Sequence, residues 1–250
     1  MPEPGMLLDL ALTLHPARPP EHQDGQAVLA SRLGYAEVWL PVDAARGFPG
    51  AARLAGLARA AAPTRLGLLV SGTEPDVIGE LLRQAGGPAA DALIELVGIA
   101  PGPALVHAAG GAGAWRARVR LPAFDPSAAG TVVTAATRTG SLTGIAVAAA
   151  QRAAAGLAAA DHPVIAALPV SIGRTWNDAE ARSTAGGTDD AWESGLFGTY
   201  EQAQTQVLEL AAAGADGLRV TVPDAVDVAD LLTQVQSVVM GATPVLGRRN

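Results

Sequence analysis

The sequence contains no cysteine and no lysine, and each absence excludes a kind of chemistry. Without cysteine there is no disulfide, no thiolate nucleophile and no thiolate ligand for a metal, so any redox role needs a bound cofactor. All 17 basic residues are arginine, which removes the lysine amine that Schiff-base enzymes use. A phosphate-binding barrel lyase or isomerase that works through such an adduct is therefore disfavoured.

Aromatic residues are also scarce. Phe, Trp and Tyr make up 4% of the chain, whereas 49% of it is hydrophobic, and Ala, Val and Leu dominate that share. This composition is typical of helices that pack tightly on a buried parallel sheet. The net charge is −7 and no run of arginines is long enough to follow a phosphate backbone, so we expect no nucleic-acid partner.

The amino-terminal residues give no sign of a targeting segment or a membrane anchor. Residues 1–14 carry no positively charged leader, and their apolar run is too short to span a bilayer. With no cysteine framework and a length common among α/β barrels, the chain is expected to form one cytoplasmic domain over residues 1–250.

Two distant segments share one order of helix, glycine and strand. Residues 33–43 read LGYAEVWLPVD and residues 213–224 read AGADGLRVTVPD. In each, an apolar helix ends at a glycine, Gly34 or Gly214, and a short strand follows that leads to a Pro and an Asp. Helices that alternate with strands in this way predict a parallel sheet.

Eight short apolar segments along the chain are typical of buried strands. They cover residues 5–14, 36–42, 65–70, 93–99, 116–121, 131–136, 163–170 and 217–222. Helical patterns lie between or after them, at residues 24–34, 50–62, 75–85, 141–159, 199–213 and 227–240. The predicted fold is α/β, a (β/α)8 TIM barrel, with an irregular section at about residues 101–129 where Gly, Pro and Ala support no helix.

Four segments carry a resemblance to a known family. They are residues 31–43 (SRLGYAEVWLPVD), 131–150 (TVVTAATRTGSLTGIAVAAA), 163–182 (PVIAALPVSIGRTWNDAEAR) and 195–230, which begins GLFGTYEQAQ and contains GADGLRVTVPDAVDVAD. In this order they resemble the luciferase-like monooxygenase family of flavin- and deazaflavin-dependent oxidoreductases, as a short, divergent member. The resemblance implies FMN or a deazaflavin coenzyme and a small-molecule substrate, and it allows a homodimer.

The same resemblance shows where this chain departs from the family pattern. Family members commonly end the second strand with Asp-His, whereas Asp43 is followed here by Ala44. An alanine side chain can neither donate nor accept a proton, so His15 and Asp43 are the candidates for a catalytic acid or base. Either one also fits an ordinary loop residue. The alternative function is a non-catalytic barrel that acts as a partner or carrier protein.

Candidate cofactor ligands follow the strands on three loops. In residues 137–141 the glycine lets backbone amides approach a ligand, the serine stands near a helix start that favours anions, and the arginine supplies a positive fork for a phosphate. The same loop also fits an ordinary Ser-capped helix with a solvated arginine. The full set of cofactor candidates is Ser71, Thr137, Arg138, Thr139, Gly140, Ser141, Gly173 and Arg174.

A polar insertion at residues 186–193 (GGTDDAWE) is long enough to act as a lid. Trp176 and Trp192 then either stack on a ring system or pack the insertion onto the barrel rim. His22 and His162 are expected at the surface or at its boundary. No histidine lies near Asp189 and Asp190, so we expect no metal site there.

Overall fold

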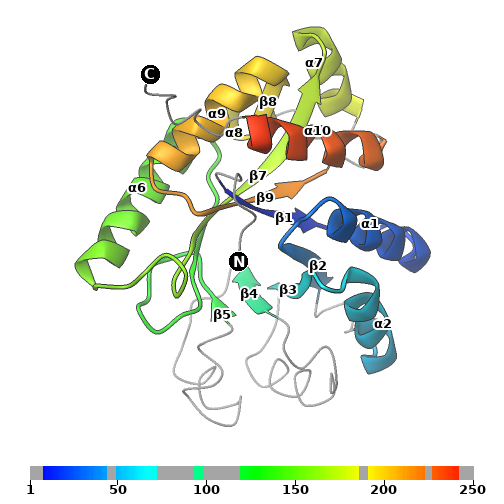
Figure 1. Cartoon of the computed structure of the whole chain (residues 1–250), viewed down its shortest axis with the longest axis horizontal. Helices are drawn as coiled ribbons and strands as arrows, with labels where there is room; N and C mark the ends of the chain where they lie inside the picture. Colours follow the sequence, from blue (N-terminus) through cyan, green and yellow to red (C-terminus); the bar gives the residue numbers. More distant parts are fainter. Residues whose placement is uncertain are drawn as a thin grey trace, which may run out of the picture.

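The computed structural model describes residues 8–43, 49–71, 93–97, 119–185, 191–222 and 227–241. Within these ranges the strands form one parallel sheet with helices outside it (Figure 1). Its strands follow the order β5-β4-β3-β2-β1-β9-β7-β6. The two ends of this order meet, because Leu121, directly after β5, is bridged in parallel to Thr131 of β6. The sheet is therefore a closed eight-stranded barrel, as predicted.

Most of the barrel strands are short, and within the described residues β1, β2, β6, β7 and β9 are each followed by a helix. The eight barrel strands are β1 (Asp9–Thr13), β2 (Glu37–Asp43), β3 (Arg65–Ser71), β4 (Leu93–Val97), β5 (Val119–Arg120), β6 (Thr131–Val133), β7 (Val164–Gly173) and β9 (Gly217–Thr221). Each of the eight predicted strand segments coincides with one of these. A further strand, β8 (Leu196–Thr199), pairs only with the second half of β7.

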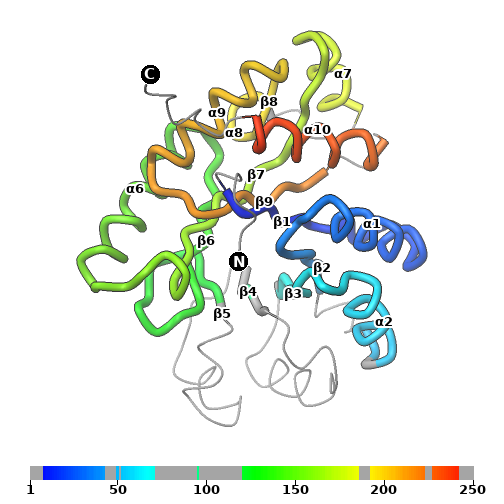
Figure 2. The backbone as a smooth tube through the Cα atoms, in the orientation of Figure 1, coloured from blue at the N-terminus to red at the C-terminus, as the bar shows by residue number. Residues whose placement is uncertain are grey.

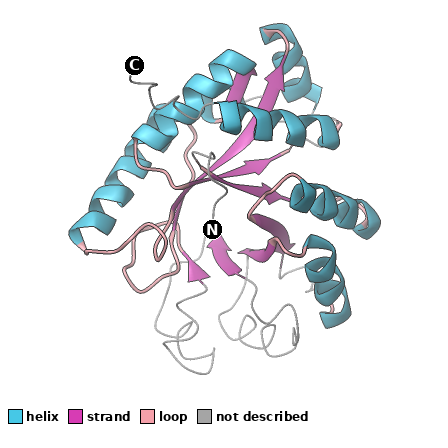
Figure 3. Ribbon diagram, viewed as in Figure 1, coloured by secondary structure: helices cyan, strands magenta, loops and turns pink. Residues whose placement is uncertain are grey.

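The helices cover the outside of the barrel (Figures 2 and 3). They are α1 (Pro20–Arg32), α2 (Ala51–Ala61), α6 (Arg138–Ala154), α9 (Tyr200–Ala212) and α10 (Val228–Gly241), and two shorter helices, α7 (Trp176–Ala185) and α8 (Ala191–Ser194), lie between β7 and β8. The helix predicted at residues 75–85 and most of the irregular section at 101–129 lie outside the described residues. None of the described helices is long and apolar enough to cross a membrane.

The repeated glycines end their helices in the same way. Gly34 has φ 77° and Gly214 has φ 103°, a backbone region that favours glycine. The amide that follows each glycine donates to a carbonyl five residues back, from Tyr35 to Ala30 and from Ala215 to Leu210. This is the Schellman arrangement, which satisfies the last carbonyls and turns the chain into the next strand. The repeat seen in the sequence is thus a repeated structural unit.

Alternation along the strands divides the buried residues into two cores. On β1, Leu10 and Leu12 point outward into the large core shared with the helices, whereas Ala11 points inward and packs with Trp39. Period-two alternation then places Glu37, Trp39 and Pro41 of β2 inside the barrel. The outward-facing residues of the strands are therefore apolar, whereas the inward-facing residues include charged ones.

Some elements differ from the prediction or were not predicted from the sequence. Helix α6 begins at Arg138, three residues before the predicted start, because Thr137 is its cap. Helix α7 buries only Ala179 and Ser183, so it has no apolar stripe to signal it. Strand β7 continues to Gly173 and its last four residues pair with β8, which is too short to stand out.

Candidate functional site

The carboxyl ends of the barrel strands bring several candidate residues to one edge. Because parallel strands end at the same side of a barrel, this edge is where ligands bind in such folds. Asp43 of β2 and Ser71 of β3, both predicted site residues, are register partners at the last position of their pairing. Thr13 of β1 pairs likewise with Thr221 of β9. The side chains of Asp43 and Ser71 lie outside the described part of the structure.

The interior beneath this edge is filled by two ion pairs. Glu37 accepts a hydrogen bond of 2.5 Å from each of the two terminal nitrogens of Arg120, and a third of 2.9 Å from Trp39 Nε1. Glu95 accepts two hydrogen bonds from Arg219. All five of these side chains are buried. We call this set, Glu37, Trp39, Glu95, Arg120 and Arg219, the barrel floor.

Trp39 joins the two ion pairs of the floor. The guanidinium carbons of Arg120 and Arg219 lie 5.4 and 5.2 Å from the indole centroid, within the range of cation–π attraction. Gly67 on β3 makes room for the ring, because a Cβ there would lie 2.4 Å from the indole. Two arginines balance two glutamates, so the formal charges of the floor cancel and its five side chains occupy the interior at this level, although the buried Nε of Arg120 has no hydrogen-bond partner among the described residues. A ligand therefore has to lie above it, at the carboxyl ends of the strands.

The floor was not predicted from the sequence. Its signal was present, since Glu37 and Glu95 interrupt apolar strands at inward-facing positions and Arg219 does the same in β9. Buried charges are stable only when paired. Carboxylates and arginines inside predicted barrel strands could therefore have been matched with one another.

The wall above the floor is apolar and half-buried. Pro41 of β2, Leu69 of β3 and Pro169 of β7 continue the inward-facing positions and are partly exposed. Beside them Thr13 is 8% exposed, and its Oγ1 has no hydrogen-bond partner among the described residues. A buried hydroxyl without a partner is costly unless a ligand or water satisfies it. This wall suits a flat apolar ring that has a polar edge.

His15 stands just beyond β1 at the same edge. Its Nδ1 accepts a hydrogen bond of 3.3 Å from the amide of Ala17, which places the proton of the neutral ring on Nε2. Its carbonyl accepts from Gln23 Nε2 at 3.1 Å. The imidazole is thus held in one tautomer at the rim, on the strand next to the one that ends at Asp43.

The loop before α6 is a capped helix start. Thr137 Oγ1 accepts a hydrogen bond of 3.2 Å from the amide of Gly140, and a Cβ on Gly140 would lie 3.1 Å from Thr137 Oγ1. The predicted role of Ser141 as the residue at the helix start is wrong, because Thr137 is the N-cap. The guanidinium of Arg138 is ion-paired with Glu209 of α9. The amides of Arg138 and Thr139, in the first turn, have no partner within the helix.

Ser141 is the fourth residue of α6. It is 1% exposed, and its Oγ has no hydrogen-bond partner among the described residues. A second orphaned hydroxyl thus lies beside the first turn of a helix that follows a barrel strand. Both features suit an anion bound at this helix end.

The second predicted loop, with Gly173 and Arg174, also leads into a capped helix. Thr175 Oγ1 accepts from the amide of Asp178 at 3.2 Å, and the Asp178 carboxylate accepts from the amide of Thr175 at 3.0 Å. A Cβ on Gly173 would lie 2.6 Å from the amide nitrogen of Ala179. The glycine therefore lets α7 pack against the end of β7, and Arg174 is exposed.

The two tryptophans considered for a lid, Trp176 and Trp192, are both exposed. Trp176 packs edge-on against Phe197 of β8, with ring centroids 4.8 Å apart, and 45% of it stays exposed. Trp192 is 58% exposed. The predicted lid falls partly on residues 186–190, outside the described residues. Among the described residues no group of three potential metal ligands is found.

His162 is not at the surface, and that prediction was wrong. It is 1% exposed and lies at the amino-terminal end of β7. Its Nε2 lies 2.9 Å from Thr131 Oγ1, its Nδ1 lies 3.1 Å from the carbonyl of Ala128, and its ring contacts Phe124. Burial lowers the pKa of His162 below its usual value. It is a packing residue far from the ligand-binding edge.

This chain is similar to known proteins in its fold but not detectably in its sequence. The sequence matches no protein-family model and no curated protein at a significant level. The structure does match solved ones. A coenzyme F420-dependent tetrahydromethanopterin reductase from Methanopyrus kandleri superimposes with a TM-score of 0.72 at 12% identity, over 94% of this chain and 99% of that chain.

Two further structures have the same fold. An F420-dependent secondary alcohol dehydrogenase in complex with an F420–acetone adduct gives a TM-score of 0.61 at 12% identity, over 93% of this chain and 99% of that one. The oxygenating constituent of 3,6-diketocamphane monooxygenase from Pseudomonas putida, in complex with FMN, gives 0.55 at 10%, over 94% and 98%. The chain thus has the α/β barrel fold of these F420- and FMN-dependent enzymes, as its luciferase-like resemblance predicted.

Proposed function

We propose that this protein is an oxidoreductase that uses reduced FMN or the deazaflavin F420 on a small organic substrate. The observation that carries the proposal is the half-buried apolar wall of Pro41, Leu69 and Pro169 with the unpartnered hydroxyl of Thr13 beside it. A flavin or deazaflavin ring has two apolar faces and a polar edge that can satisfy that hydroxyl. The shared fold with F420- and FMN-dependent enzymes supports the same assignment.

The phosphate of the cofactor fits the first turn of α6. The amides of Arg138 and Thr139 are available there by position, and the buried Ser141 hydroxyl has no hydrogen-bond partner in the part of the chain that the structure describes. The helix end favours a negative charge, and no side-chain cation is needed because the dipole supplies the attraction. Thr137 and Gly140 shape this turn. Ser71, Gly173 and Arg174 complete the proposed contacts from neighbouring strand ends.

We assign proton transfer to or from the substrate to residues at the carboxyl ends of the barrel strands. When bound, the reduced cofactor supplies the electrons, because the chain has no redox-active thiol. His15, with its proton on Nε2, can donate to a substrate oxygen at the carboxyl end of β1. Asp43 ends the adjacent strand and can accept a proton in turn. The buried side chains of the floor, none of them more than 8% exposed, lie beneath the proposed substrate position.

The proposal also includes the domain organisation, location and partners expected from the sequence. The chain acts as one domain over residues 1–250, in the cytoplasm, on a small molecule and without nucleic acid or a membrane partner. A homodimer is compatible with it.

One observation favours a second candidate, a non-catalytic barrel that serves as a partner or carrier protein. Two groups of the loop that would hold a phosphate are already satisfied internally, since the Gly140 amide donates to Thr137 and the Arg138 side chain is ion-paired with Glu209. A barrel of this kind needs no ligand to be complete. The two candidates differ in whether a cofactor stabilises the fold.

Thermal unfolding with and without cofactor tests the proposal. A ligand present at 100 times its Kd adds about 2.7 kcal/mol to the free energy of unfolding. We expect FMN or F420 to raise the Tm, and the added stability to grow with the logarithm of its concentration above the Kd. No rise with either compound, together with recovery of the chain from cell extract in a defined complex, would favour the carrier protein.

A further inference from the structure

The first turn of α6, where the cofactor phosphate is proposed to bind, contains an arginine that already has a partner. Arg138 is the first residue of this helix. Its guanidinium is ion-paired with the carboxylate of Glu209 on α9, 71 residues further along the chain, and the two side chains are 37% and 45% exposed. Because opposite charges in contact largely cancel, the pair adds little net charge at this helix start.

The attraction that remains for a phosphate comes from the helix itself. The amides of Arg138 and Thr139 have no partner within the helix, and a helix start is equivalent to about half a positive charge. Side chains on a helix tilt towards its amino end, which directs the Ser141 hydroxyl towards this turn. That hydroxyl belongs to a residue that is 1% exposed, and it has no hydrogen-bond partner among the described residues. Apart from the paired arginine, these groups provide hydrogen-bond donors and a partial charge.

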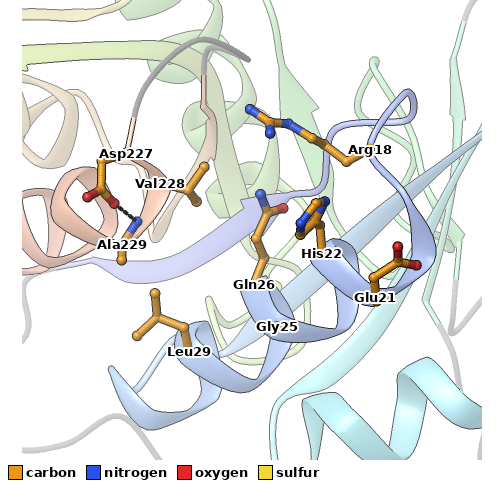
Figure 4. A pocket seen from close by; sticks show the side chains of 9 residues that line it. All are labelled: Arg18, Glu21, His22, Gly25, Gln26, Leu29, Asp227, Val228 and Ala229. Carbon is orange, nitrogen blue, oxygen red and sulfur yellow. Dashed lines mark hydrogen bonds between the residues drawn. The ribbon is translucent and has the colours of Figure 1, made fainter.

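The start of α10 shows the opposite case. Figure 4 shows it beside a pocket of about 360 Å³ that lies between α1 and α10, with the Asp227 carboxylate bonded to the amide of Ala229 at 3.0 Å. The same carboxylate accepts from the amide of Asp230 at 3.2 Å, so the chain itself supplies a negative charge there. At α6 the cap is the neutral hydroxyl of Thr137. An external anion therefore complements the start of α6, whereas the start of α10 is already complemented.

We infer that Glu209, by neutralising Arg138, makes the α6 site prefer a singly charged phosphodiester to a doubly charged phosphate monoester. The inference rests on the proposed function, since it concerns the phosphate of the same cofactor. The half charge of the helix start balances much of one negative charge. A second negative charge has to leave water without an opposite charge beside it, which is costly. Without Glu209, the guanidinium of Arg138 would be available to that second charge.

This preference separates the two proposed cofactors. FMN carries its phosphate as a monoester, whose second pKa is about 6, so that it is a dianion at about pH 7.5. F420 carries its phosphate as a diester, which remains a monoanion. The α6 site therefore favours the deazaflavin coenzyme over FMN.

Three ligands with the same ring measure the effect of the phosphate charge. They are FMN, the methyl phosphodiester made from FMN, and riboflavin. Each is titrated in its fluorescent oxidised form at about pH 7.5 in about 0.1 M salt, where charges more than about 10 Å apart are screened. We expect the diester to bind to the wild-type chain about twofold or more tighter than FMN, and riboflavin to bind most weakly. F420 is titrated alongside them and should respond to each variant as the diester does.

Glu209→Gln frees the guanidinium of Arg138 and should strengthen the binding of both phosphates. Coulomb energy is proportional to charge, so a gain of about threefold for the diester corresponds to about ninefold for FMN. Riboflavin should change by less than about 1.5-fold. The matched control is Glu201→Gln, which removes the same charge from the first turn of α9, about 12 Å away along the helix. It should change each Kd by less than about 1.5-fold.

A second pair of variants tests whether the ion pair acts as one neutral unit. Arg138→Gln leaves the Glu209 carboxylate unpaired beside the site, so it should weaken the binding of FMN more than that of the diester. Combining Arg138→Gln with Glu209→Gln removes both charges and should return each Kd to within about twofold of the wild-type value.

Two results overturn the inference while leaving the proposed function in place. One is that Glu209→Gln leaves unchanged the Kd of every phosphate-bearing ligand that binds. The other is that the wild-type chain binds FMN more tightly than its methyl diester. Absence of binding by all four compounds would overturn the proposed function, and the inference with it.

Discussion

Glu95 of β4 and Arg219 of β9 form a two-bond ion pair across the barrel, although 124 residues separate them in the sequence. Three strands lie between β4 and β9 on either route around the sheet. The pair therefore ties opposite walls together. With Glu37 and Arg120 it fixes the height of the floor, and so the depth at which a ligand can bind.

Removing one partner of this buried pair should be strongly destabilising. Arg219→Leu leaves the Glu95 carboxylate buried and unpaired, and we expect the free energy of unfolding to fall by about 3–5 kcal/mol in urea denaturation. Adding Glu95→Leu should recover most of that loss. The control is Arg138→Leu at the half-exposed pair with Glu209, where we expect about 1 kcal/mol or less. Equal losses at the two sites would contradict the buried pairing.

Gly67 should tolerate no side chain, because of its contact with Trp39. Gly67→Ala places a Cβ 2.4 Å from the indole, and the ring, held by Glu37 and two arginines, cannot move freely. We expect a loss of about 1–3 kcal/mol in chemical denaturation. Gly56→Ala, on α2 with open space around it, should instead gain about 0.5–1 kcal/mol.

The buried imidazole of His162 should make stability depend on pH. Its pKa is lowered by burial in the folded state, whereas the unfolded chain takes up a proton near pH 6.5. Its contribution is therefore complete above about pH 6.5 and is lost as the pH falls below that value. His162→Gln should flatten the fall in stability between about pH 7.5 and 5.5.

Thr13 should affect stability and binding in opposite directions. Thr13→Val keeps the shape but removes the buried hydroxyl that lacks a partner, so the cofactor-free protein should gain stability, by about 1 kcal/mol or more. Binding of FMN or F420 should weaken, because the hydrogen bond to the ring edge is lost. Fluorescence titration and thermal unfolding of the same samples measure both. A variant that loses stability without cofactor would show that the hydroxyl is already satisfied.

Ser141 should distinguish the two ends of the cofactor. Ser141→Ala removes the hydroxyl beside the first turn of α6, and we expect it to weaken FMN binding by about tenfold while leaving riboflavin, which lacks the phosphate, unchanged. Thr13→Val should weaken both compounds. If Ser141→Ala weakened riboflavin as much as FMN, the phosphate would not be bound at α6.

The positions of the strands could be predicted from the sequence because they are mostly apolar segments bounded by glycine and proline. It also placed Asp43 and Ser71 directly after two successive predicted strands, and they are the last paired residues of β2 and β3. It failed for α7, whose buried side is only Ala179 and Ser183. A helix that packs by small residues leaves no periodic signal.

The site was harder to predict than the fold. Partners such as Glu37 and Arg120 are 83 residues apart, and no local pattern shows which carboxylate meets which arginine. The predicted phosphate fork, Arg138, is held by Glu209 on another helix, a contact that depends on how α6 and α9 pack. Local chemistry pointed to a helix start within residues 137–141 but to the wrong first residue, and the neighbours of this segment in space determine which of its groups remain available to a ligand.

A crystal structure of the protein with F420 or FMN tests the central claim most directly. We predict that the ring lies above the floor against Pro41, Leu69 and Pro169, with its polar edge on Thr13, and that the phosphate lies at the first turn of α6. A ring bound elsewhere, or crystals that take up neither compound at concentrations that saturate known F420- and FMN-dependent enzymes, would contradict it.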